Sequence, residues 1–128
     1  MIRFKSDKQQ AEWSGYEIDN KIRKIVNLAN SFCSIEAPDY PGPMITDLLR
    51  TVEEYRAIYK DPEMRPGVHT YGRGVDIRTS DMPDGLADKL ALALDQITYD
   101  VARPEMKSVI YGTEKHYDHM HIQTYPRR

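Results

Sequence analysis

The sequence predicts an α+β domain in which a small antiparallel sheet is flanked by two long helices and a short one. Two long stretches carry apolar residues every three or four positions, which is typical of amphipathic helices. Several short strand-like segments lie apart from these stretches and do not alternate with them regularly, which favours α+β over a parallel α/β sheet. A chain of 128 residues fits a single domain over 1–128, and we interpret 1–15, which shows no clear period, as a polar lead-in.

Three segments are predicted to be helical. Apolar residues at helical spacing predict the first long helix over about 16–32, and a second such pattern predicts the other over 86–101. Between them, Thr51 and Glu54 form the spacing of a capping box, so a short helix is expected over 52–59.

Four segments are predicted to be extended. The proline-rich connection 34–43 leads into the apolar run 44–50, and 75–78 follows a glycine-containing turn. Two further strand candidates, 109–111 and 119–124, close the chain and flank a charged loop. No internal repeat or interdomain linker interrupts the chain, so the predicted strands are expected to form one small sheet.

The composition excludes several classes of protein. Eighteen Lys and Arg against 20 Asp and Glu argue against a general nucleic-acid partner, because such proteins carry a basic excess. The single cysteine, Cys33, permits neither an intrachain disulfide nor a cysteine-only metal site. No segment looks like a membrane span, and the polar first ten residues lack the apolar core of a secretory signal. We therefore expect a protein made in the cytoplasm with no membrane partner.

One histidine opens a compact motif. His69 begins the run HTYGRGVD, in which Asp76 follows seven positions later and two glycines lie between. These residues are too far apart to share a helix face, but a glycine turn followed by a strand can direct both side chains to one point.

The other three histidines fall within the run HYDHMH. Alternate residues of a strand share a face, so His119 and His121 should point the same way while the residues between them face the core. Together, His69, Asp76 and one histidine of this cluster provide two imidazoles and a carboxylate. That donor set suits zinc and leaves its fourth position open for water, which places the metal site on the sheet.

The run HTYGRGVD resembles the H-x-x-G-x-A-x-D signature of the zinc D-alanyl-D-alanine metallopeptidase superfamily. That superfamily includes VanX- and VanY-like dipeptidases and carboxypeptidases, phage L-alanyl-D-glutamate endolysins and penicillin-insensitive murein endopeptidases. The upstream TDLLRT and downstream HYDHMH also match in order and approximate distance, so the resemblance covers about 44–124. It implies that His69, Asp76 and His121 hold one zinc ion.

Other site residues follow from the same resemblance. Arg50 corresponds to the arginine that grips the substrate, through a terminal carboxylate or a carbonyl oxygen that becomes negative. Gly74 replaces the usual alanine, and Gly67 stands where a serine often precedes the first ligand. Both replacements are small residues and remove no ligand.

The general base has two candidates. Related enzymes use a Glu three residues before the last ligand, where this chain has Asp118, or a His two residues before it, where it has His119. Strand geometry favours His119, because Asp118 would point away unless a bulge intervenes. His116 completes an H-x-x-H-x-H pattern and is a candidate partner of the base or of the tetrahedral intermediate.

The resemblance implies a zinc peptidase that hydrolyses an amide bond in peptidoglycan stem peptides or cross-links. The absence of a visible targeting segment fits a phage or prophage lysin that reaches the cell wall when another factor releases it. Two alternatives remain. His119-Met120-His121 also resembles the His-hydrophobic-His pair of rolling-circle and transposon nucleases, and a non-catalytic domain of a virion or binding protein could use the same zinc for stability.

Overall fold

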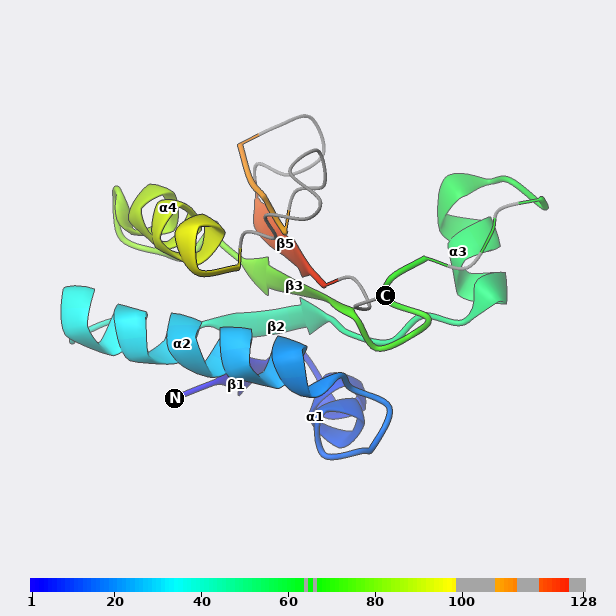
Figure 1. The fold of residues 1–128 in the computed structure, drawn as a ribbon, viewed down its shortest axis with the longest axis horizontal. Coiled ribbons are helices and arrows are strands. Elements are labelled where there is room, and N and C mark those ends of the chain that lie inside the picture. Colours follow the sequence, from blue (N-terminus) through cyan, green and yellow to red (C-terminus); the bar gives the residue numbers. More distant parts are fainter. Residues whose placement is uncertain (64, 66, 99–107, 113–117, 125–128) are drawn as a thin grey trace.

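The computed structural model describes residues 1–63, 65, 67–98, 108–112 and 118–124. Within these ranges four helices and five strands alternate irregularly, which confirms the predicted α+β class. In chain order they are β1 (Arg3–Phe4), α1 (Asp7–Trp13), α2 (Asn20–Glu36), β2 (Met44–Asp47), α3 (Val52–Tyr59), β3 (Gly74–Arg78), α4 (Leu86–Thr98), β4 (Val109–Ile110) and β5 (His119–Gln123). Figure 1 shows α2 running along the central strands, with α3 standing apart at one end.

The five strands form one sheet in the order β1-β2-β3-β5-β4. Three of its pairings are antiparallel, but β1 pairs with β2 in parallel. The predicted small sheet is therefore mixed, because one of its edge pairings is parallel rather than antiparallel. The sequence analysis did not predict β1, because a strand of only two residues is too short to produce a period in the sequence.

Residues 1–15, the predicted polar lead-in, contain both β1 and α1. The sequence of α1, DKQQAEW, has no apolar stripe, and contacts with distant residues hold it instead. The Phe4 and Trp13 rings lie 6.4 Å apart, and the Arg23 guanidinium of α2 lies 5.0 Å from the centre of the Trp13 ring. Tertiary packing can stabilise a helix whose own sequence gives little amphipathic signal.

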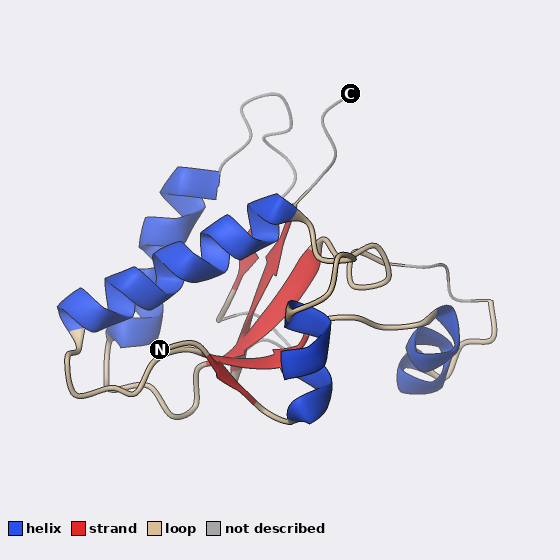
Figure 2. Ribbon diagram, turned by 90° about the horizontal axis from the view of Figure 1, so that it is seen from below, coloured by secondary structure: helices blue, strands red, loops and turns tan. Residues whose placement is uncertain are grey.

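The core lies between one face of the sheet and the helices α2 and α4 (Figure 2). From α2 it includes Ile22, Ile25, Val26, Ala29 and Cys33, and from α4 it includes Leu86, Leu90 and Leu94. The predicted bounds of α2 were four residues too early at each end. Its start is set by Asp19, which caps the helix by accepting a hydrogen bond from the backbone N–H of Lys21. The capping box of α3 is present as predicted, whereas the expected end of the second long helix near 101 lies outside the described residues.

The two central strands have two different faces. Val75 and Ile77 of β3 and Met120 and Ile122 of β5 are fully buried against the helices. The residues that alternate with them are mostly polar and project from the opposite face of the sheet. This open face carries the candidate site. No helix in the described ranges is long and apolar enough to cross a membrane.

Candidate metal centre

Three side chains from separate segments converge on the open face. His69 lies in the turn before β3, Asp76 lies on β3, and His121 of β5 is the register partner of Asp76. One ligand atom from each residue lies within 4.8 Å of the other two. This cluster could hold a metal ion, as predicted, while the choice of zinc stays a prediction.

Two glycines shape the turn that carries His69, for different reasons. Gly72 has a φ of 68°, and a Cβ there would lie 1.8 Å from the backbone oxygen of Glu17. Only glycine fits that position. At Gly74 a Cβ would lie 2.7 Å from the Val68 side chain. Gly74 therefore provides space, whereas Gly72 provides the left-handed backbone conformation that the turn requires.

Hydrogen bonding fixes the orientation of the His69 ring, which is only 2% exposed. Its Nδ1 lies 2.9 Å from the carbonyl oxygen of Leu48, and because a carbonyl only accepts, Nδ1 carries the proton. In the neutral ring Nε2 then presents a lone pair, 3.5 Å from Oδ1 of Asp76. Two ligands of a tetrahedral zinc, each ~2.1 Å from the ion, lie about 3.4 Å apart. The pair therefore has the separation and the chemistry of metal ligands.

His121 completes the cluster. Its Nδ1 lies 2.8 Å from Oδ1 of Asp76, and its ring centre lies 5.2 Å from that of His69. The other ring nitrogen, Nε2, lies 2.9 Å from the side-chain oxygen of Gln123. A partner on the second nitrogen is the usual way in which a protein orients a ligating imidazole. No pattern in the sequence singles out Gln123.

Asp76 is the electrostatic centre of the cluster, and its side chain is 10% exposed. Burial alone would raise the pKa of its carboxyl group, but hydrogen bonds and positive charge from His121 and His69 outweigh burial and hold that pKa well below its usual range. Asp76 is therefore ionised at neutral pH, as a metal ligand must be.

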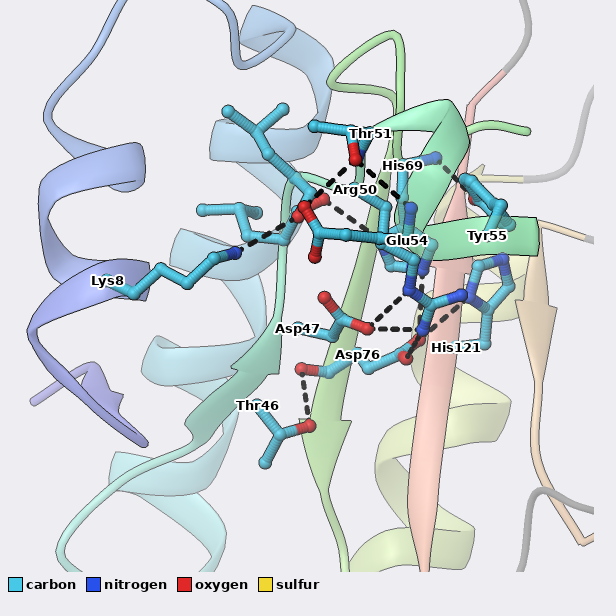
Figure 3. A network of polar contacts seen from close by, with 12 residues as sticks. Lys8, Thr46, Asp47, Arg50, Thr51, Glu54, Tyr55, His69, Asp76 and His121 are labelled. Atoms are coloured by element: carbon cyan, nitrogen blue, oxygen red, sulfur yellow. Dashed lines mark hydrogen bonds and ion pairs between the residues drawn. The ribbon is translucent and has the colours of Figure 1, made fainter. Parts of the chain in front are cut away.

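Arg50, the predicted substrate-binding residue, lies beside the cluster with 12% of its side chain exposed (Figure 3). Its Nε donates to Asp47 at 2.7 Å, its Nη2 donates to the same carboxylate, and Nη2 lies 3.6 Å from Oδ2 of Asp76. The guanidinium also lies 5.0 Å from the centre of the Tyr55 ring. Two carboxylates and an aromatic face thus hold Arg50 in place.

A bulge in β2 brings Asp47 to this position. Ile45 pairs with Ile77 and Asp47 pairs with Asp76, so two steps along β2 match one step along β3. Ile45 can therefore face the core while Asp47 joins Asp76 on the open face. The sequence analysis did not identify Asp47, because a bulge depends on pairing with another strand and leaves no local pattern.

Tyr55 of α3 connects the first ligand to Arg50. Its phenol oxygen accepts a hydrogen bond of 3.1 Å from the backbone N–H of His69, and its side chain is almost fully buried. A Cβ at position 67 would lie 2.6 Å from that oxygen. The packing of Tyr55 therefore accounts for the glycine at position 67, where the peptidase superfamily that the motif resembles often has serine. Sequence reasoning missed Tyr55, since its position in a capped helix indicates only a helical residue.

The two candidate bases form a pair. Nδ1 of His119 lies 2.8 Å from Oδ1 of Asp118, and their side chains are 27% and 81% exposed. The burial alternation of β5 places His119 and His121 on one face, as expected. Asp118 contacts His119, the residue next to it in the chain. Because a carboxylate accepts, Nδ1 donates and Nε2 of neutral His119 is left as a proton acceptor. His116 lies outside the described residues.

A cleft of about 600 Å³ opens onto the cluster. Its lining includes His69, Asp76 and His121 together with Arg50 and His119. On another side, α3 contributes an aromatic and aliphatic wall made of Tyr55, Ile58 and Tyr59. A cleft of this size admits several residues of a peptide or a comparably sized ligand.

Comparisons with protein-family models, with curated proteins and with solved structures give no match. The class of site therefore rests on its own geometry, which is two imidazoles and a buried carboxylate at the edge of an open cleft. A metal ion held there would be accessible to a ligand in the cleft, and a proton acceptor, His119, lines the same cleft.

Proposed function

We propose that the chain is a zinc-dependent peptidase that hydrolyses an amide bond in peptidoglycan stem peptides or cross-links. The observation that carries this proposal is the convergence of His69, Asp76 and His121 at an open cleft. Within the described ranges no fourth His, Cys, Asp or Glu joins the cluster. Three protein ligands with an open position are typical of catalytic zinc, whereas structural zinc normally has four.

Zinc in this site would lower the pKa of its water and polarise the scissile carbonyl. The remaining chemistry belongs to the protein. His119 accepts the proton of the attacking water at Nε2 and delivers it to the leaving nitrogen. Asp118 accepts a hydrogen bond from Nδ1–H of His119, which selects the tautomer with a lone pair on Nε2 and stabilises the imidazolium that forms afterwards.

Arg50 stabilises the negative charge that develops on the carbonyl oxygen of the substrate. Asp47 and Tyr55 hold its guanidinium in the cleft lining before a substrate arrives, so little reorganisation is needed during the reaction. The peptidoglycan substrate comes from the sequence resemblance, and the cleft beside α3 is large enough for a peptide.

The same geometry supports a peptidase over the two alternatives. A His-hydrophobic-His nuclease would use His119 and His121 as a ligand pair, but here His121 associates with His69 and Asp76 while His119 associates with Asp118. A zinc held only for stability would require neither an adjacent base nor a cleft.

The test is to digest purified peptidoglycan with the zinc-loaded protein and to identify the released peptides by mass spectrometry. We expect cleavage at a stem-peptide or cross-link amide. Asp76→Ala should lose stoichiometric zinc and more than about 100-fold of turnover, because it removes a ligand. Asp88→Ala is the matched control, since it makes the same change on an exposed part of α4. Full cleavage by metal-free Asp76→Ala, or nicking of single-stranded DNA without peptide release, would refute the proposal.

A further inference from the structure

A second, smaller hollow of about 290 Å³ lies next to the metal centre. Its lining includes Lys5, Thr46, Arg78 and Ser80, and it shares Asp76 and His119 with the larger cleft. The two hollows therefore meet at the residues proposed to bind zinc and to move the proton. Six residues of this hollow do not line the larger cleft. Of these, Asp47 holds Arg50 and Asp118 orients His119, whereas the four named above take no part in the chemistry described so far.

The sheet places this hollow on the open face. Arg78 follows Asp76 by two positions on β3, so the two side chains project from the same face. Arg78 is also the register partner of His119 on β5. Lys5 directly follows β1, and its backbone N–H donates to the carbonyl of Ile45 at 2.9 Å, which holds it beside β2.

The positively charged side chains of the hollow differ from its carboxylates in what they contact within the described part of the chain. Among the described residues neither Arg78 nor Lys5 makes an ion pair or a side-chain hydrogen bond. The carboxylates that line the hollow are already engaged: Asp47 with Arg50, Asp76 with the two ligand histidines and Asp118 with His119.

One further carboxylate lies near enough to Arg78 to influence it. The charge of Arg78 contributes to lowering the pKa of Asp81. However, Asp81 already accepts hydrogen bonds from Arg3 at 2.8 Å and from Tyr40 at 2.9 Å. Arg78 thus contrasts with Arg50, whose guanidinium is held by Asp47 and lies beside Asp76.

We propose that this hollow is a carboxylate-binding subsite, in which Arg78 and Lys5 bind a carboxylate of the peptide substrate near the scissile bond. A guanidinium can bind a carboxylate through two parallel hydrogen bonds, and the hydroxyl group of Ser80 adds a neutral donor. The Thr46 hydroxyl already donates to the carbonyl oxygen of Asp76. The identity of the ligand as a substrate rests on the proposed peptidase function. The substrate is then an acidic peptide whose carboxylate occupies this hollow while its neighbouring residues lie along the aromatic wall of the cleft.

Three matched peptides distinguish a side-chain carboxylate from a chain-terminal one. All are N-acetylated alanyl peptides of equal length: one has D-glutamate and an amidated end, one has D-glutamine and an amidated end, and one has D-glutamine and a free terminal carboxylate. Each is mixed with zinc-loaded protein, and calorimetry and mass spectrometry report its Kd and its kcat/KM. If a side-chain carboxylate is bound, the first peptide should be preferred about tenfold over the second. If a terminal carboxylate is bound, the third peptide should be preferred about tenfold over the second.

Arg78→Gln should reduce that preference to less than about twofold, and Lys5→Gln should reduce it by a smaller factor because lysine is a single point charge. Lys24→Gln is the control, since it removes an exposed positive charge from α2. Zinc content and the thermal midpoint of each variant establish that the site and fold are intact. Equal affinity for all three peptides, or a preference that survives Arg78→Gln, would overturn the subsite. One outcome separates the two proposals. If the Kd values show a carboxylate preference that Arg78→Gln abolishes, but no peptide is cleaved, the subsite is supported and the peptidase function is not.

Discussion

The side chains on the two faces of β3 and β5 differ completely, although both sets come from the same two strands. On the covered face, Val75, Ile77 and Met120 are 0% exposed and belong to the apolar core. On the open face, Asp76 and His121 alternate with them along β3 and β5 and are held by hydrogen bonds to each other. Because side chains alternate between faces, neighbouring residues can serve stability and chemistry separately.

The contrast has an energetic consequence. Apolar burial on the covered face stabilises the fold in proportion to the area removed from water. The open face instead concentrates a carboxylate, two imidazoles and a guanidinium, groups that are costly to desolvate unless they bind one another or a ligand. Substitutions on the two faces should therefore change different observables.

The largest effect is expected on the open face, for His119→Ala. Removing the proton acceptor should lower kcat/KM on peptidoglycan by about 10²–10⁴-fold, while zinc content and the free energy of unfolding change little. Turnover of peptidoglycan measures kcat/KM, and zinc analysis and denaturant unfolding of the same protein preparation measure zinc content and stability. Asp118→Ala should lose less activity, because Asp118 only orients His119. If Asp118→Ala loses turnover while His119→Ala keeps most of it, the base is Asp118.

The covered face should give the opposite result. Ile77→Ala removes a fully buried side chain and should lower the free energy of unfolding by about 2–5 kcal/mol. The folded fraction should still bind zinc with unchanged affinity, which denaturant unfolding and a zinc titration below the midpoint can establish. Ile58→Ala is the control, since Ile58 is 55% exposed. Loss of zinc affinity in folded Ile77→Ala would show that the two faces are not independent.

A smaller effect is expected where α3 contacts the site. Tyr55→Phe keeps the ring beneath Arg50 but removes the oxygen that accepts from the buried backbone N–H of His69. Zinc affinity should fall about tenfold, as for other groups that orient a ligand. Tyr59→Phe is a close control, because Tyr59 stacks on Tyr55 at 6.2 Å yet is 48% exposed. Equal zinc affinities for the two variants would remove Tyr55 from the positioning role.

Much of the fold was predictable because its signals are local. The capping box of Thr51 and Glu54 predicted the start of α3, and period-two alternation predicted which residues of β5 face the core. By contrast, β1 and α1 depend on contacts with residues distant in sequence, such as the hydrogen bonds from Arg3 to the Gly42 carbonyl and from Lys8 to the Leu49 carbonyl. Short polar segments show no hydrophobic periodicity, so their secondary structure cannot be predicted from the sequence alone.

The candidate site divides in the same way. His69 and Asp76 were recognisable because a glycine turn and a strand link them within eight positions. Asp47 and Tyr55 were not, since one depends on a bulge and the other on packing against a glycine in another segment. The residues of the candidate metal cluster were therefore visible in the sequence, whereas those that hold the site in place required three-dimensional contacts.

The smallest predicted effect concerns a polar cluster that lies apart from the metal ligands and serves stability. Burial alone would raise the pKa of Asp81, but hydrogen bonds from Arg3 and Tyr40 outweigh it and lower that pKa. The stabilisation by this carboxylate is therefore full above its unfolded pKa of about 3.9 and is lost as the pH falls through the lower, folded value. Asp81→Asn should destabilise the protein by about 1 kcal/mol or less at pH 6, because the group is partly exposed.

Acid should remove that difference. As the pH falls from 6 towards 2, the free energies of unfolding of Asp81→Asn and the unsubstituted protein should converge, since both then carry an uncharged group at position 81. Urea unfolding at a series of pH values measures the convergence, with Asp84→Asn as the exposed control in the same loop. A gap that stays constant down to pH 2 would show that the Arg3 and Tyr40 hydrogen bonds do not depend on the charge of Asp81, and that this cluster, unlike the open face, works through neutral hydrogen bonding alone.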